Sequence, residues 1–452
     1  MYRTVLFLST ALLIFSSQLL MAQLVAGPML GHVELRTAKI WAEVVPGSSA
    51  DVWYWKKGQP EKVKSVSQTS LKSAWYAPLI FNLVDLEMNT TYDYAVTVNN
   101  KAGKKPVKAD GSFTTADLWQ WRKPAPDFSF LTGSCAYFNE PKYDRPGVPY
   151  GKDSSIFEAM AKEKAACMIW LGDNWYYREA DYFSEWGLWN RAHHDRSLPI
   201  LQPFLKAMPH YAIWDDHDYG PNDAEAGYPF KETARTIFSS YWANPTYGFK
   251  NEGINTRLSV NDCDFFMMDD RTYRSSDDMQ PMINGAPNPS KRMWGAAQLE
   301  WLKNSLLVSK APFKFIVTGS QTLNPASPFD CLQDYPIEFR ELMQFLSDEK
   351  INGVLFLTGD RHHSEIIKYS REASYSLYDI TSSPLTSGVG FAGGQEKNNP
   401  AREPNTLVEA QNYTRISVSG KPKERRLKVE FLGIKGEKLA EWSISENELK
   451  NK

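Results

Sequence analysis

The sequence has few cysteines and no excess of charge of either sign. Its 452 residues include 4 cysteines, none of them spaced as CxxC, which argues against a disulfide framework and a structural zinc knuckle. The formal net charge is −2, and no basic stripe is present, so we expect no nucleic-acid-binding patch. No HExxH or GxSxG motif supports a zinc hydrolase of another bond or a serine esterase.

Long hydrophobic runs are also absent beyond the N-terminal segment, so we expect no integral membrane segment in the mature chain. Residues 1–22 have the pattern of a secretory signal peptide. Arg3 provides a positive start, an apolar run extends from Val5 to about Leu20, and the small Ala22 offers a cleavage site. A retained membrane anchor is the alternative, for which the apolar run is short. We therefore expect an exported protein, either periplasmic or secreted.

The remaining chain is long enough for two domains. Residues 23–115 alternate apolar and polar side chains in short runs separated by turn residues, which predicts a small antiparallel β-sandwich of the fibronectin or immunoglobulin type. Residues 116–127 contain two prolines and are predicted to form a linker, followed by a second domain over 128–452. Within that domain, residues 391–405 are rich in Gly, Asn and Pro, and we expect a surface loop there.

In the second domain, apolar runs of strand length end abruptly in polar residues. Continuous apolar runs are typical of strands covered on both faces, and helical patterns at 154–164, 296–309 and 337–348 lie between some of them. Ligands of such α/β sheets bind at the carboxyl ends of the strands. We expect the residues that follow the runs to meet at one edge: Ser134 and Cys135, Asp173 and Asn174, Asp215 to Asp218, Asp269 to Arg271, Ser320 and Gln321, and Asp360 to Glu365.

The chemistry of these residues indicates a metal site. The stretch WDDHDYGPND, residues 214–223, holds four aspartates and one histidine, and burying so many like charges is costly unless cations compensate them. Carboxylates favour hard cations, imidazole suits iron or zinc, and a thiolate or phenolate suits Fe(III) or zinc. Two adjacent ions that share a carboxylate commonly serve phosphoryl chemistry.

Taken together, the motifs GSC, LGDNWY, WDDHD, GDRHH and ITSSPL resemble those of PhoD-like alkaline phosphatases and phosphodiesterases. These enzymes are metallophosphoesterases and relatives of the purple acid phosphatases, and the resemblance spans about residues 28–450. It implies an α/β (α+β) catalytic domain with a two-sheet β-sandwich flanked by helices. It also implies hydrolysis of phosphomonoesters, phosphodiesters or both, by a metal-activated hydroxide that attacks phosphorus. The substrate would be a small phosphoester or a phosphate-containing polymer or lipid.

The resemblance also implies a set of metal ligands. It suggests Fe(III) and Ca²⁺, although Zn²⁺, Mn²⁺ or Mg²⁺ would suit the same donors. The implied ligands of the iron, with the carboxylate that bridges both ions named last, are Cys135, Tyr176, His362 and Asp173. The implied ligands of the second ion, with two further candidates named last, are Asp216, Asp360, Gln321 and Asn222. Tyr177 is a rival to Tyr176.

Three further residues are candidates for direct roles in catalysis. His217 would contact the substrate and donate a proton to the leaving group. Arg271 is a candidate phosphate clamp through its planar guanidinium, but it could instead pair with Asp269 or Asp270. His363 could contact the substrate or form a hydrogen bond outside the ligand set.

A non-catalytic function is the alternative hypothesis. The β-sandwich and a Trp-rich surface could bind glycans, while the acidic cluster held structural calcium in a secreted protein. A purely structural calcium site needs only oxygen ligands. Cys135, Tyr176 and His362 therefore favour the metal-dependent phosphoric ester hydrolase.

Overall fold

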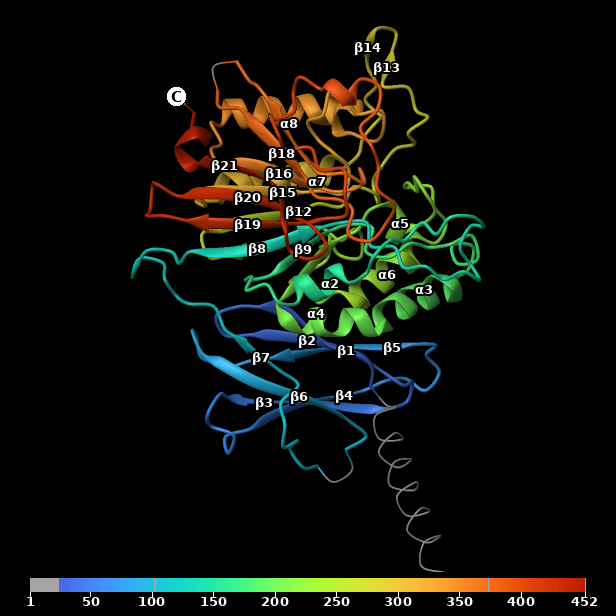
Figure 1. Cartoon of the computed structure of the whole chain (residues 1–452), viewed down its shortest axis with the longest axis vertical. Helices are drawn as coiled ribbons and strands as arrows, with labels where there is room; N and C mark the ends of the chain where they lie inside the picture. Colours follow the sequence, from blue (N-terminus) through green and yellow to red (C-terminus); the bar gives the residue numbers. More distant parts are fainter. Residues whose placement is uncertain (1–23, 101–102, 373, 452) are drawn as a thin grey trace, which may run out of the picture.

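The computed structural model describes residues 24–100, 103–372 and 374–451, which form two domains stacked along the longest axis (Figure 1). The predicted signal peptide, residues 1–22, lies outside the described residues. In the ranges that are described, no helix is both long and apolar enough to cross a membrane.

The smaller domain is an antiparallel β-sandwich, as predicted. Its sheets have the strand orders β1-β2-β5 and β4-β3-β6-β7, and every pairing within them is antiparallel. The buried side chains of this core include Ile40, Val52, Phe81 and Tyr94. The strands are β1 (Leu24–Val33), β2 (Ala38–Val44), β3 (Ser49–Lys56), β4 (Lys64–Thr69), β5 (Ala77–Leu83), β6 (Thr91–Val98) and β7 (Gly111–Thr114).

The larger domain contains two six-stranded mixed sheets packed face to face. Phe130 of the first sheet makes edge-to-face contacts with Phe265 and Phe315 of the second, at ring-centroid distances of 5.0 and 5.4 Å. The first sheet, in spatial order, is β10 (His210–Ile213), β9 (Met168–Leu171), β8 (Phe128–Gly133), β19 (Tyr413–Ser419), β20 (Arg426–Leu432) and β21 (Lys438–Ser445). The second, in the same manner, is β11 (Thr256–Val260), β12 (Cys263–Met267), β15 (Phe313–Val317), β16 (Val354–Thr358), β18 (Leu377–Thr381) and β17 (Glu365–Tyr369).

Helices cover the outer faces of both sheets. In Figure 1, one group lies between the first sheet and the β-sandwich, while α7 and α8 lie with the second sheet. The first group comprises α2 (Ile156–Met160), α3 (Glu185–Ser197), α4 (Gln202–Ala207) and α6 (Lys231–Tyr241), with the short α5 (Asp216–Tyr219) at the strand ends. The others are α7 (Ala296–Val308) and α8 (Pro336–Asp348). This arrangement confirms the predicted α/β (α+β) two-sheet fold.

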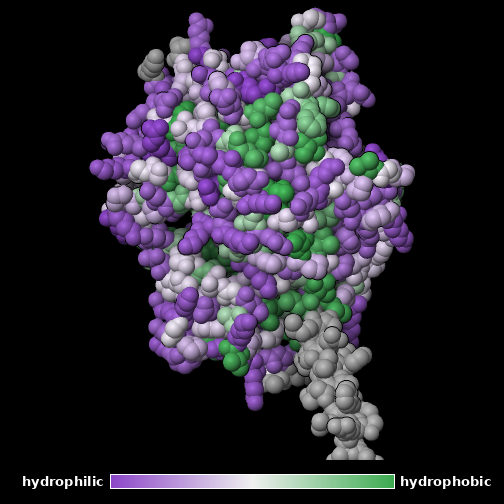
Figure 2. Space-filling view, viewed as in Figure 1, coloured by the Kyte–Doolittle hydropathy of each residue, from purple (hydrophilic) through white to green (hydrophobic). Residues whose placement is uncertain are grey.

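The β-sandwich is docked on helices of the larger domain. The buried Trp41 donates its indole N–H to the carbonyl of Ser240, at 2.9 Å. The buried carboxylate of Glu43 contacts His193 Nδ1 at 2.8 Å and accepts a hydrogen bond from Tyr241 at 3.1 Å. Outside such contacts, hydrophilic residues cover most of the face in Figure 2, and hydrophobic ones gather in separate patches.

Two expectations need correction. The segment 391–405 is not simply a surface loop, because it contains a short helix at Glu396–Asn398, and Glu396 is buried where Arg361 donates to its carboxylate at 2.6 Å. The helical pattern at 154–164 produces only the five residues of α2.

Candidate metal centre

The carboxyl ends of the parallel strands bring the expected residues to one edge. Strands β8, β9 and β10 run parallel to one another, as do β12, β15, β16 and β18. Cys135 follows β8, Asp173 follows β9, and Asp215 and Asp216 follow β10. Because parallel strands end at the same edge of a sheet, residues distant in the sequence become neighbours.

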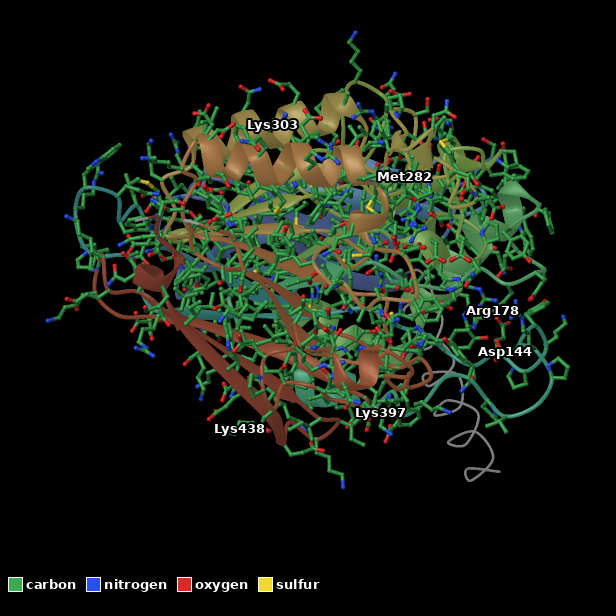
Figure 3. All side chains as sticks on the ribbon, turned by 90° about the horizontal axis from the view of Figure 1, so that it is seen from above. Asp144, Arg178, Met282, Lys303, Lys397 and Lys438 are labelled. Atoms are coloured by element: carbon green, nitrogen blue, oxygen red, sulfur yellow. The ribbon has the colours of Figure 1, made fainter. Side chains whose placement is uncertain are left out.

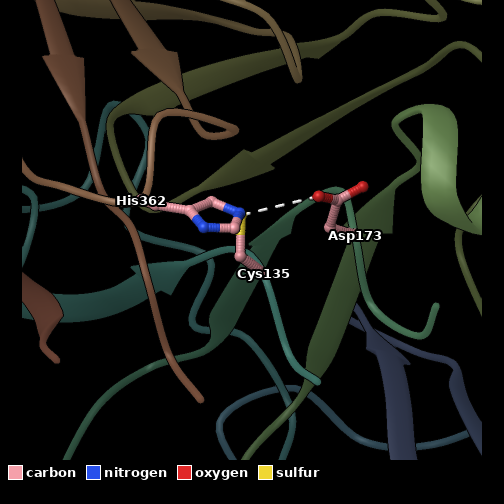
Figure 4. A group of neighbouring side chains, drawn as sticks. All are labelled: Cys135, Asp173 and His362. Carbon is pink, nitrogen blue, oxygen red and sulfur yellow. Dashed lines mark hydrogen bonds between the residues drawn. The ribbon is translucent and has the colours of Figure 1, made fainter. Parts of the chain in front are cut away.

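The first group of donors combines a thiol, a carboxylate, a phenol and an imidazole. Ligand atoms of Cys135, Asp173 and His362 all lie within 4.8 Å of one another. Figure 4 shows these three side chains, with the 3.6 Å contact between Cys135 Sγ and Asp173 Oδ2 drawn as a dashed line. The Tyr176 hydroxyl donates to Asp173 Oδ2 at 2.9 Å and lies 3.4 Å from His362 Nε2. Its rival Tyr177 instead packs in the hydrophobic core.

A second group shares Asp173 with the first. Ligand atoms of Asp173, Asp216 and His217 also lie within 4.8 Å of one another. His217 Nε2 is 3.9 Å from Asp216 Oδ2, and its ring lies against that of Tyr176 at a centroid distance of 4.1 Å. The half-buried Asp360 is nearby, with its carbonyl oxygen 3.6 Å from Cys135 Sγ. Burial raises the pKa of the Asp360 carboxyl to about 7, against the opposing effect of Arg361.

The backbone at these strand ends adopts an uncommon conformation. The left-handed region, which favours glycine, is occupied by Cys135 (φ 63°), Asp173 (φ 53°), Asp360 (φ 64°) and His362 (φ 58°). Such conformations cost on the order of 1 kcal/mol or more per residue and gather at functional sites. Four donor residues in one cluster therefore mark this edge as a site.

The electrostatics of the cluster fit bound cations. Burial raises the pKa of Asp173 well above its usual range, and the carboxylate of Asp216 adds to the effect. Burial, together with the charge of Asp173, likewise raises the pKa of the Cys135 thiol and the Tyr176 phenol. The buried Nδ1 of His217 has no hydrogen-bond partner within the described part of the chain. Positive ions among these groups would favour their deprotonated, ligating forms.

Arg271 supports the turn that carries Asp216 and His217. Its Nε donates to Asp215 Oδ1 at 2.7 Å, and one terminal nitrogen lies 3.3 Å from Asp330 Oδ2. Asp215 is in turn the N-cap of α5, in a capping box with Asp218. The alternative of a side-chain pair with Asp269 or Asp270 is not the one seen among the described residues, where Asp215 and Asp330 are the partners.

Three predicted site residues have their nearest polar partners away from the shared cluster. Gln321 donates to Glu365 and Thr381, both at 2.9 Å, and the buried His363 has its Nε2 3.5 Å from Glu365 Oε1. Asn222 is exposed, and its side chain donates a hydrogen bond to the carboxylate of Asp223 at 2.6 Å. The backbone amide of Asp223 in turn donates to Asp216 Oδ2 at 2.7 Å. Their roles stay predictions.

The structure adds residues to which the sequence reasoning gave no role. Ser383 donates to Cys135 Sγ at 3.2 Å and accepts from the His362 amide at 3.0 Å. Its place in the ITSSPL motif was the signal that could have identified it. Tyr150, whose hydroxyl lies 3.1 Å from His362 Nδ1, belongs to no motif quoted above.

Glycine at position 319 allows the backbone to approach the side chain of Asp215 closely. We therefore predict that Gly319→Ala destabilises the protein. An added Cβ would lie 2.5 Å from Asp215 Cγ, in a fully buried setting. We expect a loss of about 1–3 kcal/mol in the free energy of unfolding, measured by urea denaturation. Gly227→Ala is the matched control, because nothing lies within 4 Å of its Cβ position. Equal stability of the two variants would contradict the prediction.

Comparison with known proteins supports the same interpretation. Residues 130–433 match the family model described as PhoD-like phosphatase, and residues 21–114 match a domain of unknown function (DUF7800). Alkaline phosphatase D of Bacillus subtilis (strain 168) is 23% identical over 282 residues, covering 53% of this chain. The match covers 46% of that protein, so the chain spans about half the length of this curated relative.

Solved structures show the same fold. A structure of PhoD has a TM-score of 0.76 at 18% identity, covering 95% of this chain and 91% of that one. A purple acid phosphatase from yellow lupin (Lupinus luteus) seeds has a TM-score of 0.64 at 11% identity, covering 92% and 74%. Because the matching family model extends over more than half of the sequence, the chain belongs to the PhoD-like phosphatase family.

Proposed function

We propose that the protein is an exported hydrolase of phosphomonoesters, phosphodiesters or both, acting at a two-metal centre. The observation that carries the proposal is the position of Asp173, whose carboxylate belongs to both donor groups. Cys135, Tyr176 and His362 would hold one ion, for which Fe(III) suits the thiolate and phenolate. Asp216 and Asp360 would hold the other, for which Ca²⁺ suits the carboxylates. Export rests on the sequence pattern of residues 1–22.

When bound, such ions would supply a nucleophile at neutral pH and neutralise developing charge on the phosphoryl group. The side chains around them orient the ester and move its proton. His217 is half-buried, and its Nε2 lies at the edge of the cluster beside Asp216, where it can donate a proton to the leaving oxygen. Burial lowers the pKa of His217, while Asp216 opposes that shift.

Arg271 can complete the site in one of two ways. Its Nη1 is buried and has no hydrogen-bond partner among the described residues, so it could donate a hydrogen bond to a phosphoryl oxygen. The rest of the guanidinium holds Asp215 and Asp330, which keeps α5 in place. The second role is independent of substrate, so it would show in the stability of an Arg271 variant even without phosphate.

Metal analysis and hydrolysis assays on the purified full chain test the proposed function. We expect bound iron or zinc together with a second divalent ion, and cleavage of nitrophenyl phosphate, bis-nitrophenyl phosphate or both. Removal of the ions with a chelator should abolish the cleavage, and their return should restore it. A protein that carried calcium alone and cleaved neither compound would overturn the proposal in favour of a calcium-stabilised glycan-binding protein.

A further inference from the structure

Tyr150 is an exposed tyrosine whose hydroxyl faces the metal centre. The side chain is 43% exposed, whereas its neighbours Tyr137 and Tyr176 are 8% and 2% exposed. Its hydroxyl lies 3.1 Å from Nδ1 and 3.4 Å from Nε2 of His362. Because its ring is exposed and its hydroxyl contacts His362, Tyr150 forms the outer wall of the site.

The loop that carries Tyr150 is fixed in place. Arg178 lies two residues after Tyr176, donates to Asp144 Oδ1 at 2.9 Å and to the carbonyl of Phe138 at 2.7 Å, and stacks 3.8 Å over the Tyr137 ring. Asp144 and Arg178 are labelled beside each other in Figure 3. At the end of the loop, the side chain of Asn139 binds both the amide and the carbonyl of Gly151. These contacts hold the loop, and with it Tyr150, in one position beside the cluster.

Exposed apolar side chains from two other loops lie next to the same edge. Phe391, 73% exposed, follows Gly390, whose amide donates to the carbonyl of His362 at 2.8 Å. Phe329 is 63% exposed, and its ring centroid lies 4.4 Å from the guanidinium carbon of Arg361. Arg361 stands between Asp360 and His362 in the sequence. Apolar groups exposed beside a polar site are typical of ligand-binding surfaces.

We propose that Tyr150 contacts the substrate and that the site selects phosphoesters with a large apolar group; this inference rests on the proposed function. The Tyr150 hydroxyl donates a hydrogen bond to a phosphoryl oxygen of the bound ester. Its ring, with Phe391 and Phe329, receives the aromatic or long alkyl group attached to the phosphate. A small polar ester, such as glycerol phosphate, leaves these three side chains exposed to water and gains nothing from them.

The test compares Tyr150→Phe and Tyr150→Ala with the native metal-loaded chain. Tyr143→Phe is the matched control, because Tyr143 lies in the same loop and has Lys142, rather than the cluster, over its ring at 4.9 Å. Naphthyl phosphate and glycerol phosphate serve as the apolar and polar esters. Bound metal is measured by elemental analysis, and inorganic phosphate binding is measured by calorimetry.

Tyr150→Phe should weaken phosphate binding and lower kcat/KM for both esters by about tenfold, with bound metal unchanged. Tyr150→Ala should cause a further loss of about tenfold in kcat/KM for naphthyl phosphate and none for glycerol phosphate. Phosphatidic acid in phosphatidylcholine vesicles separates the sources of the apolar group. If Tyr150→Ala loses kcat/KM for naphthyl phosphate but not for the vesicles, the substrate is a soluble aromatic ester. If the loss of kcat/KM extends to the vesicles, the substrate is a lipid.

Three results would overturn the proposal. They are native-like phosphate binding and kcat/KM in Tyr150→Phe, unchanged preference between the two esters in Tyr150→Ala, and loss of bound metal in Tyr150→Phe, which would make the residue a ligand. If the native chain binds metal but hydrolyses neither ester, the proposed function fails. Phosphate binding by Tyr150→Phe then still decides whether the hydroxyl contacts a phosphoryl oxygen.

Discussion

Replacing Asp173 by asparagine should abolish phosphoester hydrolysis while leaving the chain folded. The carboxylate of Asp173 is shared by both donor groups of the cluster, and it accepts a hydrogen bond from the Tyr176 hydroxyl at 2.9 Å. Asparagine keeps the shape but loses the negative charge that two cations would share. We expect kcat/KM for nitrophenyl phosphate to fall by about 1,000-fold or more. Bound metal, measured by elemental analysis, should fall with it.

The stability of Asp173→Asn separates this explanation from simple damage to the fold. In the metal-free protein, burial and the neighbouring Asp216 already disfavour the charge on Asp173. A neutral amide removes that repulsion, so the melting temperature of the metal-free variant should equal or exceed that of the native protein. Asp278→Asn, at an exposed position outside the cluster, is the control and should retain full activity. Unchanged turnover in Asp173→Asn would exclude the bridging role.

Replacing Arg271 by methionine should lower the free energy of unfolding more than Gly319→Ala, Asp173→Asn or Arg415→Met does. Arg271 is 1% exposed and contacts both Asp215 and Asp330, of which Asp215 is fully buried. Without the guanidinium, the carboxylate of Asp215 would lose its cation next to Asp216, whereas Asp330 would keep its ion pair with Arg274. Removing one partner of a buried ion pair costs about 3–5 kcal/mol, because the other charge stays buried without compensation. Urea denaturation at neutral pH measures this difference.

A surface arginine provides the comparison. Arg415 pairs with Glu163 and Glu430 at 3.0 Å, and its side chain is 32% exposed. Arg415→Met should cost less than about 1 kcal/mol, because solvent screens exposed pairs. Equal losses in the two variants would show that Arg271 does not hold the turn. If Arg271→Met stayed as stable as the native protein yet bound phosphate more weakly, the clamp role would stand instead.

The strand-end residues could be predicted because the pattern that encodes them is local. An apolar run predicts a buried strand, and the residue after it must lie at the sheet edge, as Cys135, Asp173 and Asp360 do. The small β-sandwich follows from the same kind of local pattern, whereas the arrangement of the larger domain in two sheets was implied by the family resemblance. This part of the site needed no knowledge of contacts between distant side chains.

Other features depend on contacts that no local pattern specifies. Arg271 contacts Asp330, which lies 59 residues away in the sequence. Glu396 lies in a segment whose composition predicts exposure, and a distant arginine, Arg361, makes its burial tolerable. Tyr150 lies in a loop that is held by contacts of Arg178 with Asp144 and of Asn139 with Gly151. Each depends on a partner chosen by the tertiary fold.

The docking of the β-sandwich on the helices has a consequence for how the chain unfolds. Trp41 and Glu43 of the small domain are buried against α3 and α6, which themselves lie between that domain and the first sheet. Separating the domains would break the hydrogen bonds of Glu43 and Trp41 and expose the apolar surface of the buried indole to water. The two domains should therefore melt together in a single cooperative transition, and neither should behave as an independent module.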